Sequence, residues 1–372
     1  MKICIVGAGN MGLAMASSIS MKSEFEVTVF TKHVFDASSL VFRDVENDKE
    51  YSDLKIKVES DMKAAFEGAE YIMCTYPSML RASFIKEATP FLKSGVKLMF
   101  VPGYGGAEYA CKELIESGVT VVGLQRVPYV ARQEEKKVAQ VLSRKNTLYV
   151  ASIPQAGIES ICNDLFQMLD IECVALNEYL AVTLVPSNPL LHLTGLYHVF
   201  KNYEPGDYFD KELMFYEEWD DETSRVLFSY DDELQEICRK MSPLDLIEVV
   251  SLRIHYESDT PEALTRKLKS IPSLYNVVKV PLELKNGKYY PDFGSRMFIE
   301  DFPFGIAIIK YFALLTDTKT PTIDSILEFY KDKTGIEYFK EDGTLGSDYD
   351  KSGIPGLYGL DTLPKIVDFY RQ

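Results

Sequence analysis

The fold of the first half of the chain is decided by the stretch Lys2-Ile3-Cys4-Ile5-Val6-Gly7-Ala8-Gly9-Asn10-Met11-Gly12, which a helical run to Ser20 follows. Its apolar beginning is typical of a strand buried on both faces of a parallel sheet. In the G-x-G-x-x-G that comes next, Gly7 permits a tight turn, Gly9 lets the backbone approach a pyrophosphate, and Gly12 lets the helix pack against the strand. We therefore predict that Gly7, Ala8, Gly9, Asn10, Met11 and Gly12 bind a dinucleotide, in preference to a glycine-rich turn without a ligand.

The end of the second expected strand, Glu26 to Thr31, bears on which cofactor is bound. Dinucleotide-binding units that take NAD usually place Asp or Glu there to bind the ribose diol. This chain instead reads Phe30-Thr31-Lys32-His33, without an acid. A hydroxyl followed by cations suits a 2′-phosphate, so we predict NADP as the preferred cofactor, with NAD as the alternative. Lys32 as a solvated loop charge is the competing interpretation.

Strand and helix patterns then alternate for about 180 residues, which indicates a doubly wound α/β fold. A strand ending in Tyr76-Pro77 and a strand followed by the glycine-rich turn around Tyr104 place residues where open sheets bind ligands. We predict that Tyr76 and Pro77 contact the cofactor. A hairpin is expected around Arg144–Asn146, followed by a helix over 155–169 and a strand from Glu172 to Leu176.

The pattern changes at Val185-Pro186-Ser187-Asn188-Pro189-Leu190-Leu191-His192, from which a helix continues to Phe200. Ser187 or Asn188 can cap it and Pro189 fits its first turn. Strand propensity is low beyond this point, so an all-helical second half is predicted, with helices at Pro243–Tyr256, Glu262–Lys269, Pro303–Leu315, Ile323–Lys331 and Leu363–Arg371. We divide the chain into a Rossmann domain, 1–180, and a helical domain, 181–372.

Bulk composition limits the functional classes. A net charge of −16 argues against nucleic acid and anionic membranes as partners. The six cysteines are scattered without a C-x-x-C pair, so we expect reduced core residues of a cytoplasmic protein and neither a metal site nor disulfides. No apolar run approaches a membrane span, and no signal peptide is expected.

The chain has four histidines, and His192 is the candidate acid–base group. Asn188 lies four residues earlier and shares its helical face. A hydrogen-bonded core histidine is the competing interpretation. A second constellation is Arg296-Met297-Phe298-Ile299-Glu300-Asp301-Phe302-Pro303-Phe304-Gly305. Arg binds carboxylates with planar geometry, and an Asp beside a His would orient it, although a surface ion pair would give the same pattern.

These motifs resemble the opine dehydrogenases, the octopine and nopaline dehydrogenase family. The resemblance rests on the N-terminal glycine loop, N-P-x-x-H at Asn188–His192, R-x-x-x-E-D-x-P-F-G at Arg296–Gly305, and the late segment Gly353–Gly359. Pro128–Arg132 is similar to the family's P-[WY]-x-x-R segment. The resemblance implies a Rossmann domain joined to a helical domain of 6-phosphogluconate-dehydrogenase-like architecture.

The family's chemistry couples the amine of an amino acid to a 2-oxo acid, often pyruvate, and reduces the imine with NAD(P)H. The resemblance implies that His192 is the catalytic acid–base group, Asp301 its partner and Arg296 the anchor of a substrate carboxylate. Asn188 and Tyr104 are the further substrate-binding candidates. Tyr104 departs from the family pattern, because a polar amide often stands there.

Two alternatives remain. A 2-oxo-acid reductase related to ketopantoate reductase would place a lysine near His192, but no lysine occurs from Ala156 to Phe200. A non-catalytic nicotinamide sensor would not need His192, Asp301 and Arg296. Small-molecule substrates are the expected partners, and the chain is expected to be a monomer or a homodimer.

Overall fold

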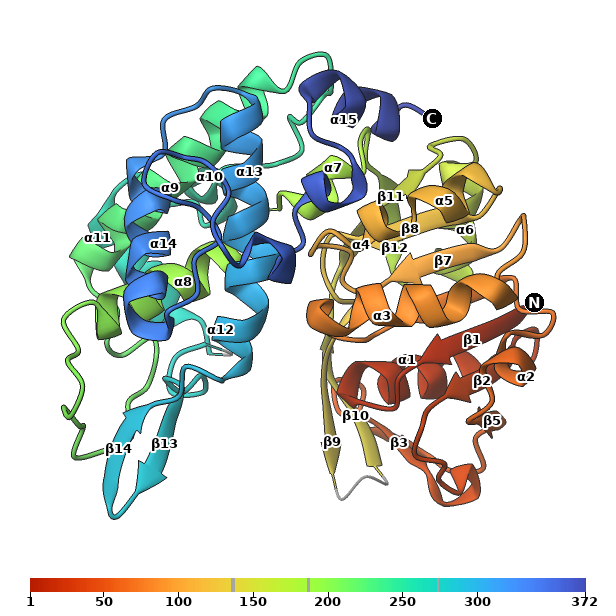
Figure 1. The fold of residues 1–372 in the computed structure, drawn as a ribbon. Coiled ribbons are helices and arrows are strands. Elements are labelled where there is room, and N and C mark those ends of the chain that lie inside the picture. Colours follow the sequence, from red (N-terminus) through yellow and green to blue (C-terminus); the bar gives the residue numbers. More distant parts are fainter. Residues whose placement is uncertain (135–137, 186–187, 273) are drawn as a thin grey trace. The chain divides into compact units, whose positions relative to one another are not determined.

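The computed structural model describes residues 1–134, 138–185, 188–272 and 274–372 (Figure 1). The chain forms two compact units. Unit 1 contains Met1–Thr183 together with Ile366–Gln372, and unit 2 contains Leu184–Lys365. Among the described helices, none combines the length and the apolar character that crossing a membrane requires.

An eight-stranded sheet forms the centre of unit 1. Its strand order is β12 (Glu172–Ala175), β11 (Thr147–Ile153), β8 (Thr120–Leu124), β7 (Lys97–Phe100), β6 (Tyr71–Cys74), β1 (Lys2–Val6), β2 (Glu26–Phe30) and β5 (Ile56–Glu59). The strands from β5 to β8 are parallel, whereas β11 pairs with β8 in antiparallel register. The strand order reverses at β1, which confirms the predicted doubly wound fold.

Helices follow the strands of this sheet (Figure 1). They are α1 (Asn10–Ser20), α2 (Met62–Phe66), α3 (Ser78–Ala88), α4 (Ala107–Ala110), α5 (Lys112–Glu116), α6 (Ile158–Leu169) and α7 (Leu180–Thr183), with single 3₁₀ turns η1 (Ala37–Ser39) and η2 (Thr89–Phe91). The central strands are apolar because both of their faces are covered. In β1, Ile3 to Val6 are at most 1% exposed. The unbroken apolar runs of the sequence are therefore buried strands, as predicted.

A second sheet in unit 1 was not predicted. Its order is β4 (Lys49–Tyr51), β3 (Val41–Asp44), β10 (Val138–Arg144) and β9 (Tyr129–Glu134). The predicted hairpin around Arg144–Asn146 is wrong, because β10 pairs with β9 and β3, and β11 pairs with β8 and β12 in the other sheet. The chain changes sheets at this turn, and the hairpin is formed by β9 and β10 instead.

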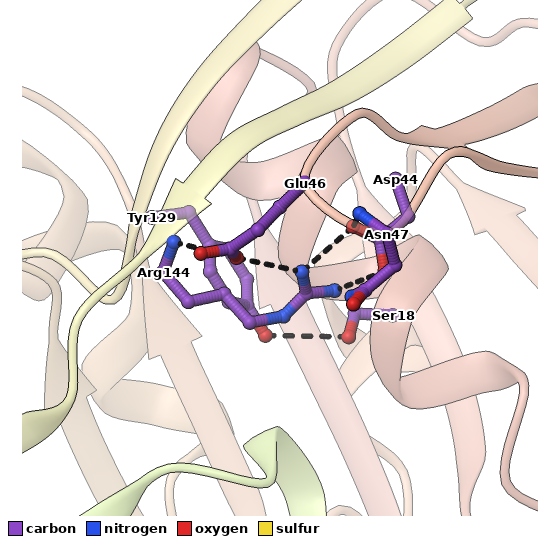
Figure 2. A network of polar contacts seen from close by, with 6 residues as sticks. All are labelled: Ser18, Asp44, Glu46, Asn47, Tyr129 and Arg144. Carbon is purple, nitrogen blue, oxygen red and sulfur yellow. Dashed lines mark hydrogen bonds and ion pairs between the residues drawn. The ribbon is translucent and has the colours of Figure 1, made fainter.

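A buried ion pair holds the second sheet together (Figure 2). Both terminal nitrogens of Arg144 donate to the carboxylate of Asp44 at 2.8 Å, and the pair is largely buried. The guanidinium also lies over the ring of Tyr129, whose hydroxyl donates to Ser18 on α1 at 3.2 Å. Tyr129 of the Pro128–Arg132 segment is therefore a structural residue, because its side chain is 1% exposed and its hydroxyl connects the sheet to α1.

The last residues of the chain correct the predicted domain boundary. Residues 366–372 were assigned to the second domain, but they belong to unit 1. The hydroxyl of Tyr370 donates to Glu108 at 3.0 Å and lies 2.7 Å from the hydroxyl of Tyr109, and the ring of Phe369 packs on that of Tyr109. Burial of these aromatic side chains against α4 keeps the end of the C-terminal helix α15 (Leu363–Tyr370) in unit 1.

Unit 2 is predominantly helical, as predicted. Its helices are α8 (Asn188–Phe200), α9 (Asp221–Lys240), α10 (Leu252–His255), α11 (Pro261–Ser270), α12 (Arg296–Asp301), the π-helical turn η3 (Phe302–Ile306), α13 (Ala307–Leu315) and α14 (Pro321–Thr334), with 3₁₀ turns η4 (Tyr349–Lys351) and η5 (Pro355–Tyr358). At the N-terminus of α9, Asp220 accepts a hydrogen bond of 2.7 Å from the backbone N–H of Thr223, and Asp221 and Glu222 lie in the first turn.

Two expectations for unit 2 need correction. Of the helix predicted over Pro243–Tyr256, only the short α10 forms. In addition, β13 (Leu282–Lys285) and β14 (Lys288–Pro291) make an antiparallel hairpin within the half that was predicted to be all helical. Its two-residue turn, Asn286-Gly287, has positive φ at both positions, which is the geometry that an Asn-Gly turn favours.

Candidate active site

The glycine loop lies at the carboxyl ends of β1 and β6, where the strand order of unit 1 reverses. Two of its glycines are required by the protein itself. A Cβ at Gly12 would lie 1.9 Å from the carbonyl oxygen of Gly7, and Gly7 has φ +106°. Gly9 differs, because a Cβ there would meet nothing within 4 Å. Gly9 is the residue before α1 and its N-terminal N–H groups, so the open space suits a phosphate of the cofactor.

A pocket of about 290 Å³ adjoins this loop. It brings together five of the predicted cofactor residues, namely Gly7, Ala8, Thr31, Lys32 and Tyr76. The other predicted cofactor residues, Gly9, Asn10, Met11, Gly12 and Pro77, do not line this pocket. Leu80, Ser83 and Glu87 on α3 also line it and were missed by the sequence analysis, because nothing in the chain pattern relates α3 to the end of β2.

Lys32 has an acidic neighbour in this pocket. Its ammonium lies 3.7 Å from the carboxylate of Glu87, and both side chains are more than half exposed. An exposed ion pair of this kind contributes little to stability. The lysine is therefore available to a phosphate, although Glu87 reduces the positive charge of the pocket.

Tyr104, a predicted substrate contact, follows β7 in unit 1 and is 8% exposed. Its carbonyl oxygen accepts a hydrogen bond of 2.5 Å from Nη1 of Arg81, whose Nε donates to the carbonyl oxygen of Tyr76 at 2.9 Å. Arg81 is 2% exposed. It therefore connects the segments that follow β6 and β7, a positioning role that no sequence pattern indicates.

In unit 2, His192 and Asp301 lie in direct contact although 109 positions separate them. His192 comes from the second turn of α8 and Asp301 is the last residue of α12. Nδ1 of His192 lies 2.7 Å from Oδ2 of Asp301, and their side chains are 19% and 5% exposed. The predicted proximity is therefore confirmed.

The buried carboxylate determines how the imidazole can act. Burial raises the pKa of the Asp301 carboxyl, and the neighbouring His192 acts in the opposite direction. A carboxylate only accepts hydrogen bonds, so the proton of the neutral imidazole lies on Nδ1 and the lone pair on Nε2. The ring of Phe215 meets the imidazole edge to face at 6.1 Å, which fixes the ring plane further. This arrangement is that of an oriented general base.

Arg296 begins α12, five residues before Asp301. Its side chain is 68% exposed, and Nε donates to the carboxylate of Glu300, which is 4% exposed. The pairing offsets part of the positive charge of the guanidinium. Asn188, the first residue of α8, is one turn before His192. Ser187, its alternative as helix cap, lies outside the described residues.

Parts of both units match models of known protein families. Residues 175–334 match the family model for the alpha-helical domain of NAD/NADP octopine/nopaline dehydrogenase. Residues 2–117 match the model for the N-terminus of NAD-dependent glycerol-3-phosphate dehydrogenase. A tauropine dehydrogenase from Arabella iricolor is 25% identical, and the alignment covers 98% of this chain and 99% of the relative.

Two solved structures of octopine dehydrogenase share the fold. One, with NADH and L-arginine, has a TM-score of 0.84 at 20% identity and covers 98% of this chain and 97% of its own. The other, with NADH and pyruvate, has the same TM-score and identity and covers 99% and 98%.

Proposed function

We propose that this chain is an opine dehydrogenase of the octopine and nopaline dehydrogenase family. It condenses the amine of an amino acid with the carbonyl of a 2-oxo acid and reduces the resulting imine with a nicotinamide cofactor. The observation that carries the proposal is the contact between His192 and the buried Asp301 in unit 2. A nicotinamide sensor has no use for an oriented acid–base pair of this kind.

Unit 1 would bind the cofactor, which supplies a hydride when bound. The N-terminus of α1 and the open space at Gly9 suit its pyrophosphate, and the pocket with Thr31, Lys32 and Tyr76 suits the adenosine end. No acid ends β2, the position where NAD-binding units usually place the carboxylate that recognises a free diol. NADP is the proposed preferred cofactor for this reason, with NAD as the alternative.

We assign the proton transfers to His192. Attack of the amine on the carbonyl requires loss of an ammonium proton, and loss of water from the carbinolamine requires protonation of its hydroxyl. Nε2 of His192 would accept the first proton and donate the second. Asp301 holds Nδ1–H throughout and stabilises the imidazolium that forms between the two steps.

Substrate binding is assigned by chemistry. Arg296 would bind the carboxylate of the 2-oxo acid, because an exposed guanidinium offers planar hydrogen bonding to an anion in a chain of charge −16. Asn188 and Tyr104 are the further proposed contacts. Pyruvate is the proposed oxo acid, since the related octopine dehydrogenase has been solved with NADH and pyruvate.

One experiment distinguishes this function from its alternatives. The purified protein is mixed with NADPH or NADH, pyruvate and a panel of amino acids, and absorbance at the nicotinamide band is followed. Cofactor oxidation that needs both pyruvate and an amino acid supports the proposal. Oxidation with the oxo acid alone identifies a reductase, and binding of the cofactor without turnover identifies a sensor.

The His192→Ala variant tests the proton chemistry. We expect kcat to fall by about 10³-fold, because general acid–base catalysis contributes about 10²–10⁴-fold and Asp301 also loses its partner. Near-normal turnover of this variant would contradict the assignment. His198→Ala is the matched control, since His198 lies on the same helix and pairs with Asp220 at 3.8 Å instead.

A further inference from the structure

The motifs around His192 and Asp301 contain residues that the proposed chemistry does not use. They include Pro189, three residues before His192, and Gly305, four residues after Asp301. Both are buried in unit 2. A Cβ at Gly305 would lie 2.6 Å from Cβ and 2.9 Å from Cγ of Pro189. The backbone of η3 therefore approaches the first turn of α8 more closely than any side chain at position 305 would permit.

We propose that the contact between Pro189 and Gly305 sets the distance between His192 and Asp301, so that both are positioning residues for the acid–base pair. The inference rests on the proposed function for its catalytic consequence. Each of the two residues lies close in sequence to the member of the acid–base pair that it positions. Pro189 is one turn of α8 from His192, and Gly305 is one turn of the continuous helix α12–η3–α13 from Asp301. A change in the distance between Pro189 and Gly305 therefore changes the distance between His192 and Asp301, because a single helical turn separates the two residues on each side.

The π-helical turn holds Gly305 in place. Pro303 has no N–H to donate, so the ordinary helical bond to Ile299 is absent at this position. The chain widens there, and the N–H of Ala307 donates to the carbonyl oxygen of Phe302 five residues earlier. From outside the helix, the N–H of Gly353 donates to the carbonyl oxygen of Pro303 at 3.0 Å. The late Gly353–Gly359 segment thus supports the turn that carries Gly305.

The size of the expected effect follows from the distances. An ordinary contact is at least 3.4 Å, so Gly305→Ala forces a retreat of about 0.8 Å, from 3.4 Å less 2.6 Å. The bond between Nδ1 and Oδ2 is 2.7 Å long, and a shift of that size along it exceeds the range of a normal hydrogen bond. A displacement near ~1 Å can lower turnover about 10²-fold.

The test compares Gly305→Ala with a compensating variant and a control. We expect kcat to fall about 10²-fold in Gly305→Ala while the KM for pyruvate stays within about threefold. In the double variant with Pro189→Gly, the nearest remaining atom is Cα of Pro189 at 3.8 Å, so kcat should recover at least about tenfold. Gly294→Ala is the control, because its Cβ meets only Oδ1 of Asp292, at 3.3 Å.

A second readout does not depend on turnover. In protein labelled with ¹⁵N-histidine, the hydrogen-bonded Nδ1–H of His192 should give a downfield proton resonance that is absent in His192→Ala. With four histidines in the chain, the assignment is simple. The resonance should disappear or move upfield in Gly305→Ala and return in the double variant. These shifts remain measurable even if the protein proves not to be an opine dehydrogenase, so the two proposals can fail separately.

Unchanged kcat and an unchanged His192 resonance in Gly305→Ala would overturn the inference. A loss of both that the double variant does not restore would also overturn it. Should Gly305→Ala fail to fold, as shown by circular dichroism, Pro189→Gly alone tests the contact without added bulk. It should broaden the resonance and lower kcat about tenfold, and wild-type values for both would contradict the proposal.

Discussion

Glu108 gives unit 1 a stability that depends on pH. The residue is fully buried on α4, and one carboxylate oxygen, Oε1, accepts hydrogen bonds from Thr183 and Tyr370. The other, Oε2, is buried without a hydrogen-bond partner among the described residues. Burial therefore raises the pKa of the carboxyl to about 7, from an ordinary value of 4.5, and the hydrogen bonds from Thr183 and Tyr370 only partly oppose it.

The folded protein thus holds this proton more tightly than the unfolded chain does. Stability that depends on the proton is complete below pH 4.5 and is lost as the pH rises toward 7. A difference of 7 less 4.5 corresponds to about 3 kcal/mol. Glu108→Gln keeps an acceptor for both hydrogen bonds but cannot titrate. Relative to this variant, the wild type should lose about 3 kcal/mol of unfolding free energy between about pH 4 and pH 8.

Urea unfolding of both proteins, followed by far-ultraviolet circular dichroism across this pH range, measures the difference. Comparison at each pH cancels the titration of all other groups. The single tryptophan, Trp219, lies in unit 2, so its fluorescence follows the unfolding of that unit separately. A difference between the two proteins that stays constant across the whole pH range would refute the reasoning about Glu108.

Three further predictions concern the candidate active site. Arg296→Ala should raise the KM for the 2-oxo acid about tenfold to a hundredfold with a smaller change in kcat, because it removes a charged binding contact. Steady-state kinetics measure both constants, and Arg225→Ala is the control for specificity, because Arg225 is another exposed arginine paired with a nearby acid. Lys32→Ala should raise the KM for NADPH about tenfold and leave that for NADH within about twofold, and an equal effect on both cofactors would rule out a 2′-phosphate contact. Gly12→Ala should destabilise unit 1 by about 3 kcal/mol, because its Cβ would lie 1.9 Å from a backbone oxygen, and a wild-type thermal unfolding curve would contradict this.

The sequence predicted those parts of the fold that short-range patterns determine. The loop from Gly7 to Gly12 is recognisable because Gly7 and Gly12 meet local requirements of the backbone and Gly9 leaves space for the expected phosphate. The Asn286-Gly287 turn carries a signal of the same kind, yet the hairpin around it was not predicted, because strand propensity is low in this half of the chain. The Asn-Gly dipeptide is the local signal that indicates this hairpin.

Long-range pairings could not be predicted from the pattern. The ion pair of Asp44 and Arg144 joins strands 100 positions apart, and Tyr370 contacts Glu108 across 262 positions. No periodicity records such contacts. The proximity of His192 and Asp301 was expected only through the family resemblance, since each segment alone was compatible with an ordinary structural role.

The most direct test of the account is the dependence of cofactor oxidation on the amino acid. With NADPH or NADH and pyruvate present, we expect oxidation only after an amino acid is added, at a rate that saturates with its concentration. The same assay with His192→Ala should show the rate reduced by about 10³-fold. Oxidation at an equal rate without any amino acid would contradict the central claim that this chain forms and reduces an imine.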